Sequence, residues 1–145
     1  MLPRRKASFS EEIMTKGQKF TKEYAKELIK IAWQDLEAAK VLAQHSVSRV
    51  ENVFLLAQQA LEKALKSVLC WNGANVPFVH EIGILVSKLE NIDKTPPFGY
   101  DLNALSEFAT IRRYLEGHET YENREIQEIL AKVEQAIGWC QSHII

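Results

Sequence analysis

The chain has 145 residues, 46% hydrophobic and 26% charged, a size and composition that suit a single domain with its own core. Eighteen basic residues against nineteen acidic ones give a formal net charge of -1. This balance excludes a strongly basic nucleic-acid binder and an acidic disordered tail, but not a local basic patch. Six glycines and four prolines are too few for a linker-rich or fibrous chain.

The cysteines and the absence of long apolar runs predict the compartment. Cys70 and Cys140 each lie in an apolar helical pattern, which predicts buried, reduced thiols and neither a disulfide scaffold nor a metal site. No apolar run approaches the roughly 20 residues that a membrane span needs. The basic start of the chain is followed by no hydrophobic segment of the kind a signal peptide has. We therefore expect a cytoplasmic protein without a membrane-spanning helix.

The first 19 residues are polar and show little periodicity. They contain the basic cluster Arg4, Arg5 and Lys6. We expect a flexible N-terminal arm over residues 1–19, followed by a single helical domain over residues 20–145. Two interpretations of the basic cluster stay open: a frayed terminus, or an arm that contacts a phosphate backbone or a partner.

Two long amphipathic helices are predicted after the arm. Apolar residues recur at spacings of three and four without an intervening Gly or Pro, which predicts a first helix over about residues 21–44. Ser48 and Glu51 have the spacing of a capping box, with Ser48 as the N-cap of a second helix. That helix is expected to end near Trp71, where an Asn-Gly pair follows.

Three further helices are predicted in the second half of the chain. A shorter helix is expected over residues 80–89, and Asp101 can cap a fourth helix that ends at Gly117. The fourth helix is expected to bury Ala104, Phe108, Ile111 and Leu115. The last helix carries the apolar residues Ile126, Leu130, Val133, Ile137 and Cys140. Since nothing alternates with a period of two, we expect no strand.

Together these elements predict an all-α fold, an up-and-down antiparallel bundle of four to five helices. Alanines on the first two helices allow those helices to approach closely. Four large apolar residues lie outside the main stripes, and they are either further core or a dimer face. These residues are Leu28, Trp33, Leu56 and Trp139.

One segment carries candidate chemistry, Arg112 and Arg113 followed by His118. Arginine stays charged and can clamp a phosphate with two hydrogen bonds, and histidine exchanges protons near neutral pH. Together they can cleave RNA without a metal. The alternative is a surface Arg pair balanced by Glu107 and Glu116, with a loop histidine. Because metal-ligand spacings, Gly-rich phosphate loops and nucleophile elbows are absent from the sequence, we expect no metal and no cofactor.

Other polar residues have structural interpretations beside functional ones. His80, at the predicted start of the third helix, either hydrogen-bonds near that helix start or lines a site. Tyr121 is a loop tyrosine by default. Lys63 and Lys66, with Glu62 beside them, predict a solvated helix face.

Several segments resemble HEPN domains (higher eukaryotes and prokaryotes nucleotide-binding). Residues 32–39 (AWQDLEAA) resemble the opening helix of that family, and residues 54–66 (FLLAQQALEKALK) closely resemble its second helix. Residues 79–82 (VHEI) match the His at the start of the family's next helix, and residues 105–114 (LSEFATIRRY) resemble the segment with the family's Arg. The resemblance spans about residues 21–142.

The resemblance implies a helical bundle that pairs as a homodimer, with the motifs of the two copies lining one cleft. Many members are metal-independent endoribonucleases with an Arg, four to six residues, and a His. Arg113 stands four residues before His118, and Arg112 stands five before it, so both fit. Arg113 is preferred because Arg113-Tyr114 matches members with the sequence Arg-Tyr-Pro.

The resemblance also implies partners. Many members are toxins encoded beside a minimal nucleotidyltransferase antitoxin, and in some pairs this partner adenylylates a Tyr just after the His. Carried over, Tyr121 is the candidate for modification, and Tyr114 and His80 are candidates to line the site. We therefore expect a ribonuclease toxin that uses Arg113 and His118. The alternative is a non-catalytic module that binds a nucleotide or a nucleotidyltransferase.

Overall fold

The computed structural model describes residues 17–45, 49–109 and 121–144. Within these ranges the chain forms four α-helices and one 3₁₀-helix, and no strand. In chain order these are α2 (Lys22–Ala43), α3 (Val50–Trp71), α4 (Ile82–Glu90), the 3₁₀-helix η1 (Asp101–Ala109) and α6 (Asn123–Ser142). The prediction of an all-α helical bundle is therefore confirmed.

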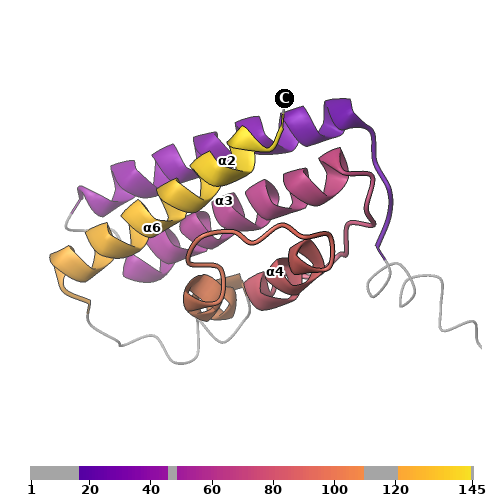
Figure 1. Cartoon of the computed structure of the whole chain (residues 1–145). Helices are drawn as coiled ribbons and strands as arrows, with labels where there is room; N and C mark the ends of the chain where they lie inside the picture. The colour runs from indigo at the N-terminus through magenta and orange to yellow at the C-terminus, as the bar shows by residue number, and fades with distance from the viewer. Residues whose placement is uncertain (1–16, 46–48, 110–120, 145) are drawn as a thin grey trace, which may run out of the picture.

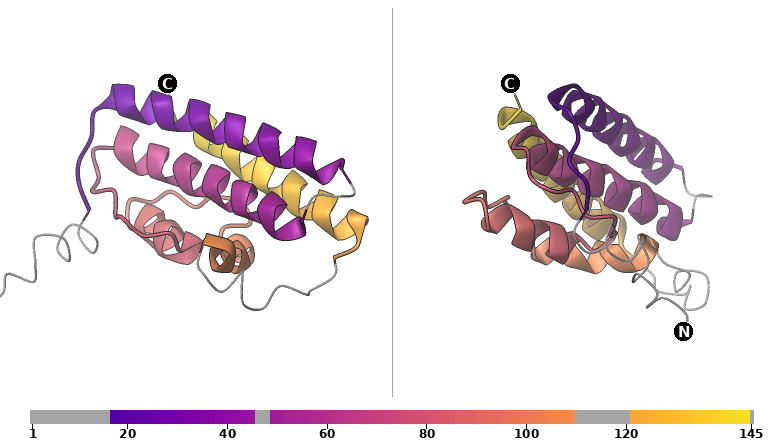
Figure 2. Two further views of the ribbon diagram at one scale, coloured as in Figure 1. Left: turned by 180° about the vertical axis from the view of Figure 1, so that it is seen from behind. Right: turned by 90° about the vertical axis from the view of Figure 1, so that its right-hand side faces the viewer.

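The three long helices lie side by side, and α4 and η1 pack along one side of α3 (Figures 1 and 2). Helix α3 runs antiparallel to α2, and α6 runs in the same direction as α3 (Figure 1). Helix α3 contacts each of the other four elements, so it is the central helix of the bundle. None of the described helices is both long enough and apolar enough to cross a bilayer.

The ends of α2 and α3 show which of the predicted capping residues the structure uses. Thr21 caps α2, because its Oγ1 accepts a hydrogen bond of 3.2 Å from the backbone N–H of Tyr24. Helix α3 ends at Trp71, as predicted. Its start differs from the prediction, since the N-cap is Arg49, which makes no side-chain capping bond. Ser48 lies outside the described residues, and Glu51 pairs with the Arg49 Nε at 3.4 Å.

The third and fourth predicted helices also need correction. Helix α4 begins at Ile82, two residues after His80. The segment that starts at Asp101 is a 3₁₀-helix, whose buried residues are Leu102, Leu105 and Phe108. A 3₁₀-helix has three residues per turn, so every third side chain faces the core, and Ala104 is exposed. The remaining predicted positions, Ile111, Leu115 and Gly117, lie outside the described residues.

Residues 17–20 lead into α2 along the end of the bundle. Gln18 exchanges two backbone hydrogen bonds with Val76, at 3.0 and 2.9 Å. Gly17 adopts φ +78°, and a Cβ there would lie 2.3 Å from the Val76 carbonyl. Only glycine fits this close approach. The expected arm over residues 1–19 thus has its last three residues beside the bundle, and residues 1–16 lie outside the described part.

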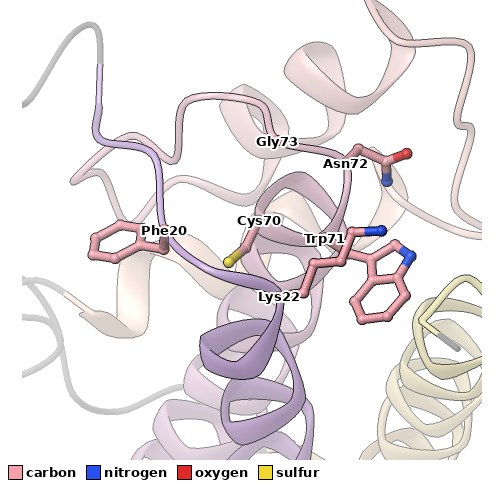
Figure 3. A pocket seen from close by; sticks show the side chains of 6 residues that line it. All are labelled: Phe20, Lys22, Cys70, Trp71, Asn72 and Gly73. Atoms are coloured by element: carbon pink, nitrogen blue, oxygen red, sulfur yellow. The ribbon is translucent and has the colours of Figure 1, made fainter.

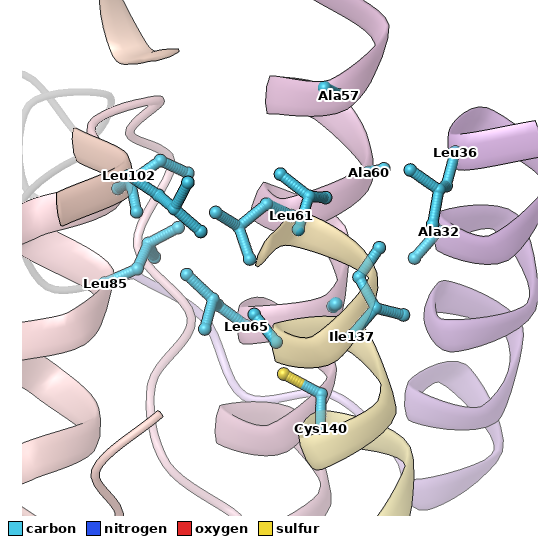
Figure 4. Packing of buried hydrophobic residues seen from close by; sticks show 14 of the residues in the cluster. Ala32, Leu36, Ala57, Ala60, Leu61, Leu65, Leu85, Leu102, Ile137 and Cys140 are labelled. Atoms are coloured by element: carbon cyan, nitrogen blue, oxygen red, sulfur yellow. The ribbon is translucent and has the colours of Figure 1, made fainter. Parts of the chain in front are cut away.

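The core is formed by α3 and the faces of the other helices that point toward it (Figure 4). Leu61 and Leu65 of α3 and Ile137 of α6 are fully buried. Small side chains line the contact of α2 with α3, among them the buried Ala32 and Ala60, which allows the close approach that the sequence indicated.

The apolar residues outside the main stripes belong to the core or pack against it. Leu28 is buried, and Trp33, Leu56 and Trp139 are half-buried against the core cluster. The Trp33 Nε1 also donates a hydrogen bond of 3.0 Å to Gln141 of α6. Cys70 and Cys140 are both free and buried, as expected.

Candidate functional site

A buried polar cluster lies on one face of α3, next to the start of α4. Gln58, Glu62 and Lys66 follow one another at intervals of four residues, which places them on the same side of the helix. Gln58 is fully buried and Glu62 is 8% exposed. His80, from the segment before α4, completes the cluster. Polar groups that are buried this deeply need partners, so each contact in the cluster matters.

The Glu62 carboxylate has three partners. Its Oε1 accepts a hydrogen bond of 2.9 Å from the Gln58 Nε2 and lies 3.0 Å from the His80 Nδ1. Its Oε2 pairs with the Lys66 Nζ at 2.9 Å. Burial raises the pKa of Glu62, but Lys66, with Gln58 and His80, outweighs burial and holds the pKa below its ordinary value. The group is therefore a charged acceptor at neutral pH.

The contacts of Gln58 determine the orientation of its amide. Its Nε2 donates to the Glu62 Oε1 and to the backbone oxygen of His80, each at 2.9 Å. Because both partners are acceptors, the nitrogen must face them. The Oε1 is buried and has no hydrogen-bond partner among the residues that the structure describes. An unpaired buried acceptor costs about 1–3 kcal/mol.

A cavity of about 270 Å³ borders the cluster. Its wall includes polar residues of α3, His80, and Ala109 at the end of η1. The lining residues are Leu55, Gln58, Gln59, Glu62, Lys63, His80 and Ala109. This volume is close to the lower end of the range for small-molecule sites. Glu62 and His80 of the polar cluster thus both belong to the wall of this cavity, together with Gln58.

The solvated face predicted for Lys63 and Lys66 is wrong. The Lys66 side chain is 12% exposed and bound to Glu62, and Lys63 pairs with Asp35 of α2. The start of α4 and the end of η1 cover this side of α3, which the spacing of residues along one helix cannot reveal. A sequence signal was present, because Gln58 and Glu62 continue the buried apolar stripe that starts at Phe54.

The Arg-His segment lies largely outside the described residues. This applies to Arg112, Arg113, Tyr114 and His118, so their mutual geometry stays a prediction. The residues that flank the segment are described, and both contact Phe54. The Phe54 and Phe108 ring centroids are 5.2 Å apart, and those of Phe54 and Tyr121 are 4.8 Å apart. Phe54 is one helical turn before Gln58.

His80 makes the hydrogen bond near a helix start that the sequence indicated, and it also lines the cavity. Its side chain is 66% exposed although its Nδ1 contacts the buried Glu62.

Side chains of η1 bind the first backbone N–H groups of α4. The backbone N–H of Ile82 donates to the Ser106 Oγ at 2.8 Å, and that of Gly83 donates to the Asn103 Oδ1 at 2.7 Å.

A second cavity, of about 420 Å³, lies where α2 begins and α3 ends (Figure 3). Phe20, Lys22, Cys70, Trp71, Asn72 and Gly73 line it. The Lys22 Nζ lies 4.4 Å from the centre of the Trp71 ring, a cation–π contact that already engages both groups.

Among the described residues no group of three or more His, Cys, Asp or Glu could hold a metal ion.

Comparison with known proteins identifies the family. The HEPN domain family model matches residues 25–143, a range that reaches from the first turn of α2 to the end of α6. The comparisons with curated proteins and with solved structures each gave no match. The family match covers the three long helices, the Gln58–Glu62–His80 cluster and the Arg-His segment. The chain therefore belongs to the HEPN domain family.

Proposed function

We propose that this HEPN protein is a metal-independent endoribonuclease. In this proposal His118 acts as an acid–base group, and Arg113, assisted by Arg112, holds the scissile phosphate. One observation carries the proposal: Phe108 and Tyr121, which flank the Arg-His segment, both contact Phe54, one helical turn before Gln58 of the cavity wall.

The two ends of the Arg-His segment support a site near the cavity. Ala109, the last described residue before the segment, lines the cavity. Tyr121, the first described residue after it, contacts Phe54.

The chemistry needs no metal. Two guanidinium groups neutralise the charge that develops on a pentacoordinate phosphorus, and an imidazole moves a proton at an attacking or leaving oxygen. Attack by the 2′-hydroxyl gives a 2′,3′-cyclic phosphate and a 5′-hydroxyl. We propose that two copies pair as a homodimer with both Arg-His segments in one cleft, in the cytoplasm. A nucleotidyltransferase antitoxin would then silence this toxin, with Tyr121 as the residue to modify.

The test is cleavage of a labelled RNA pool in excess chelator. Wild type should cleave, and His118→Ala and Arg113→Ala should each lose about 10²–10⁴-fold in rate. His45→Ala, at the exposed C-terminal end of α2, and Arg124→Ala, with a side chain that is 81% exposed, are matched controls and should keep the rate. Equal cleavage by His118→Ala, or no cleavage by wild type, would contradict the proposal.

A second candidate function is non-catalytic binding of a nucleotide or of a nucleotidyltransferase partner. The observation that favours it is the cavity beside Gln58, Glu62 and His80, since a pocket with a few polar groups in its wall can orient a small ligand such as a nucleobase. Calorimetric titration with nucleoside monophosphates, and a pull-down with a nucleotidyltransferase from the neighbouring reading frame, test it. Recovery of neither a nucleotide nor a nucleotidyltransferase would count against it.

A further inference from the structure

We infer that the end of the bundle where α2 begins and α3 ends is a docking surface for single-stranded RNA. The inference rests on the proposed ribonuclease function for the class of ligand, but the surface is a separate place on the molecule. Phe54, which contacts both residues that flank the Arg-His segment, lies near the start of α3, and Trp71 ends that helix. At a rise of 1.5 Å per residue the two positions are about 25 Å apart.

Three aromatic rings contact one another at this end of the bundle, and we call Phe20, Tyr24 and Phe78 the aromatic platform. The Phe20 and Tyr24 rings are stacked with centroids 4.6 Å apart, and Phe78 meets Phe20 edge-on at 6.4 Å. Tyr24 is 43% exposed and Phe78 is 39% exposed. Single exposed apolar side chains are ordinary on a protein surface, but exposed rings in mutual contact form a patch of the kind that marks an interaction site.

Backbone contacts hold the aromatic platform in place. Gln18 exchanges two hydrogen bonds with Val76, which brings the segment before α2 beside the segment that carries Phe78. The Thr21 cap then fixes the first turn of α2, and Tyr24 lies in that turn. A ligand that stacks on these rings therefore needs to order little of the chain, which lowers the cost of binding.

The surface around the aromatic platform is basic, although the whole chain has a net charge of -1. Residues 17–26 contain three lysines, Lys19, Lys22 and Lys26, and one acidic residue, Glu23. All four are exposed, and Glu23 lies 3.7 Å from the Lys26 Nζ. Residues 70–79, on the other side of the cavity, contain no charged side chain. This local excess of positive charge complements a phosphate backbone.

The cavity of about 420 Å³ lies between the two kinds of group. Figure 3 shows the Phe20 ring at one side of it and the Lys22 and Trp71 side chains at the other. The Trp71 ring holds the Lys22 ammonium 4.4 Å from its centre. An ammonium has three N–H donors, so one that rests on a ring face can still donate to a phosphate oxygen. The cavity is large enough for one unpaired base.

The combination of rings and lysines selects a single-stranded nucleic acid. Aromatic side chains stack on bases, which a single strand exposes and a duplex covers, and lysines bind the phosphates between them. An acidic protein segment would pair with the lysines but would gain little from the exposed Tyr24 and Phe78 rings. A single strand uses both the rings and the charges.

The test is fluorescence anisotropy with a labelled 2′-O-methyl RNA single strand, whose blocked 2′-oxygen prevents cleavage during the measurement. Tyr24→Ala and Phe78→Ala should each weaken binding by about 5–150-fold, the usual value of one base stacked on a ring. Lys22→Ala should lower the slope of log affinity against log salt by about 0.7, the value for one phosphate contact on a single strand.

Matched control variants come from another part of the bundle. Tyr100 is 56% exposed, and the Lys132 Nζ lies 5.6 Å from the centre of the Phe98 ring. Tyr100→Ala should keep the wild-type affinity, and Lys132→Ala should keep the wild-type salt slope. Because Phe20 and Trp71 pack against the core, the variants are placed at Tyr24 and Phe78, and their circular dichroism spectra should match wild type.

Three results would overturn the docking surface: wild-type affinity in Tyr24→Ala and Phe78→Ala, equal affinity for the duplex of the same sequence, or full displacement of the RNA by poly-glutamate of equal charge. Cleavage in chelator tests the ribonuclease proposal separately. An active enzyme whose RNA binding is insensitive to Tyr24 and Phe78 would keep that proposal and overturn this inference. Ring-dependent binding by a protein that cleaves no RNA would do the reverse.

Discussion

Glu62 and Lys66 form an ion pair of 2.9 Å on α3 although their side chains are only 11% and 12% exposed. Removing two charges from water costs more than their attraction returns unless further hydrogen bonds satisfy them. Here the Gln58 amide and the His80 ring supply those bonds to the carboxylate. The pair is therefore the charged centre of a network that joins α3 to the segment before α4.

Replacing Glu62 by Gln should destabilise the protein by about 3 kcal/mol, because Lys66 then stays buried without a counter-charge. Urea unfolding followed by circular dichroism measures this loss. The matched control is Glu128→Gln, which removes the carboxylate of an exposed pair with Arg124. That change should stay within about 0.5 kcal/mol. Equal losses of unfolding free energy in the two variants would show that the buried network contributes no more to stability than an exposed ion pair does.

The free energy of unfolding should fall in acid because the Glu62 carboxylate gains a proton. The folded protein holds the pKa of this carboxyl below its ordinary value of 4.5, so the stabilisation is present above about pH 4.5. It is lost as the pH falls through the lower folded value, where Glu62 gains a proton and resembles glutamine. The difference in unfolding free energy between wild type and Glu62→Gln should shrink between pH 6 and pH 3 in urea titrations. A difference that stays constant with pH would show that protonation of Glu62 does not control stability in acid.

Both cysteine thiols should be unreactive toward thiol reagents in the folded protein. Burial raises the pKa of Cys140 far above that of a free thiol, and burial also raises the pKa of Cys70, whose Sγ contacts the Thr21 backbone oxygen at 3.1 Å. Ellman's reagent at pH 8 should label both cysteines in urea and neither at an appreciable rate without it. The variants Cys70→Ala and Cys140→Ala report each thiol separately. Since Cys70 lines a cavity, it should react before Cys140, and the reverse order would be a contradiction.

The side chain of Thr21, which caps α2, should contribute to the stability of the protein. The side chain of Arg49, at the N-cap of α3, should contribute no capping bond. Thr21→Ala removes the acceptor of the Tyr24 N–H and should cost about 1 kcal/mol, whereas Thr21→Ser keeps the bond and should cost little. Arg49→Ala is the comparison at α3, where no side-chain capping bond exists. Thermal unfolding of the three variants checks this, and an equal effect of Thr21→Ala and Arg49→Ala would contradict it.

The local pattern of the chain predicted its helices well where each helix buries one stripe. Residues 21–44 were expected for a helix that spans Lys22–Ala43, and Trp71 was expected as the end of α3. The 3₁₀ geometry of η1 was not expected. A short run of apolar residues fits both three and four residues per turn, and Leu102 and Leu105 reach the core only because η1 packs against α3 and α4.

The start of α3 shows that the spacing of a capping box in the sequence does not by itself determine where a helix begins. Ser48 and Glu51 match a capping box, yet the N-cap is Arg49, and Glu51 pairs with that residue. A reciprocal box does occur at α6, where Glu122 and Glu125 fill its two positions. A three-residue spacing is common by chance, so the position at which the chain enters a helix also depends on the packing of the preceding segment.

The sequence alone determined the fold class, the three long helices and the family, because hydrophobic periodicity and the second-helix string are local properties of the chain. It also named His80, Arg113 and His118, since their chemistry is visible in residue type. Only the tertiary structure decided that Glu62 and Lys66 are buried and that Glu62 holds His80, which is 18 positions away. The physical reason is that burial and pairing depend on which elements cover a helix face, and α4 and η1 reach α3 only through the packing of the whole bundle.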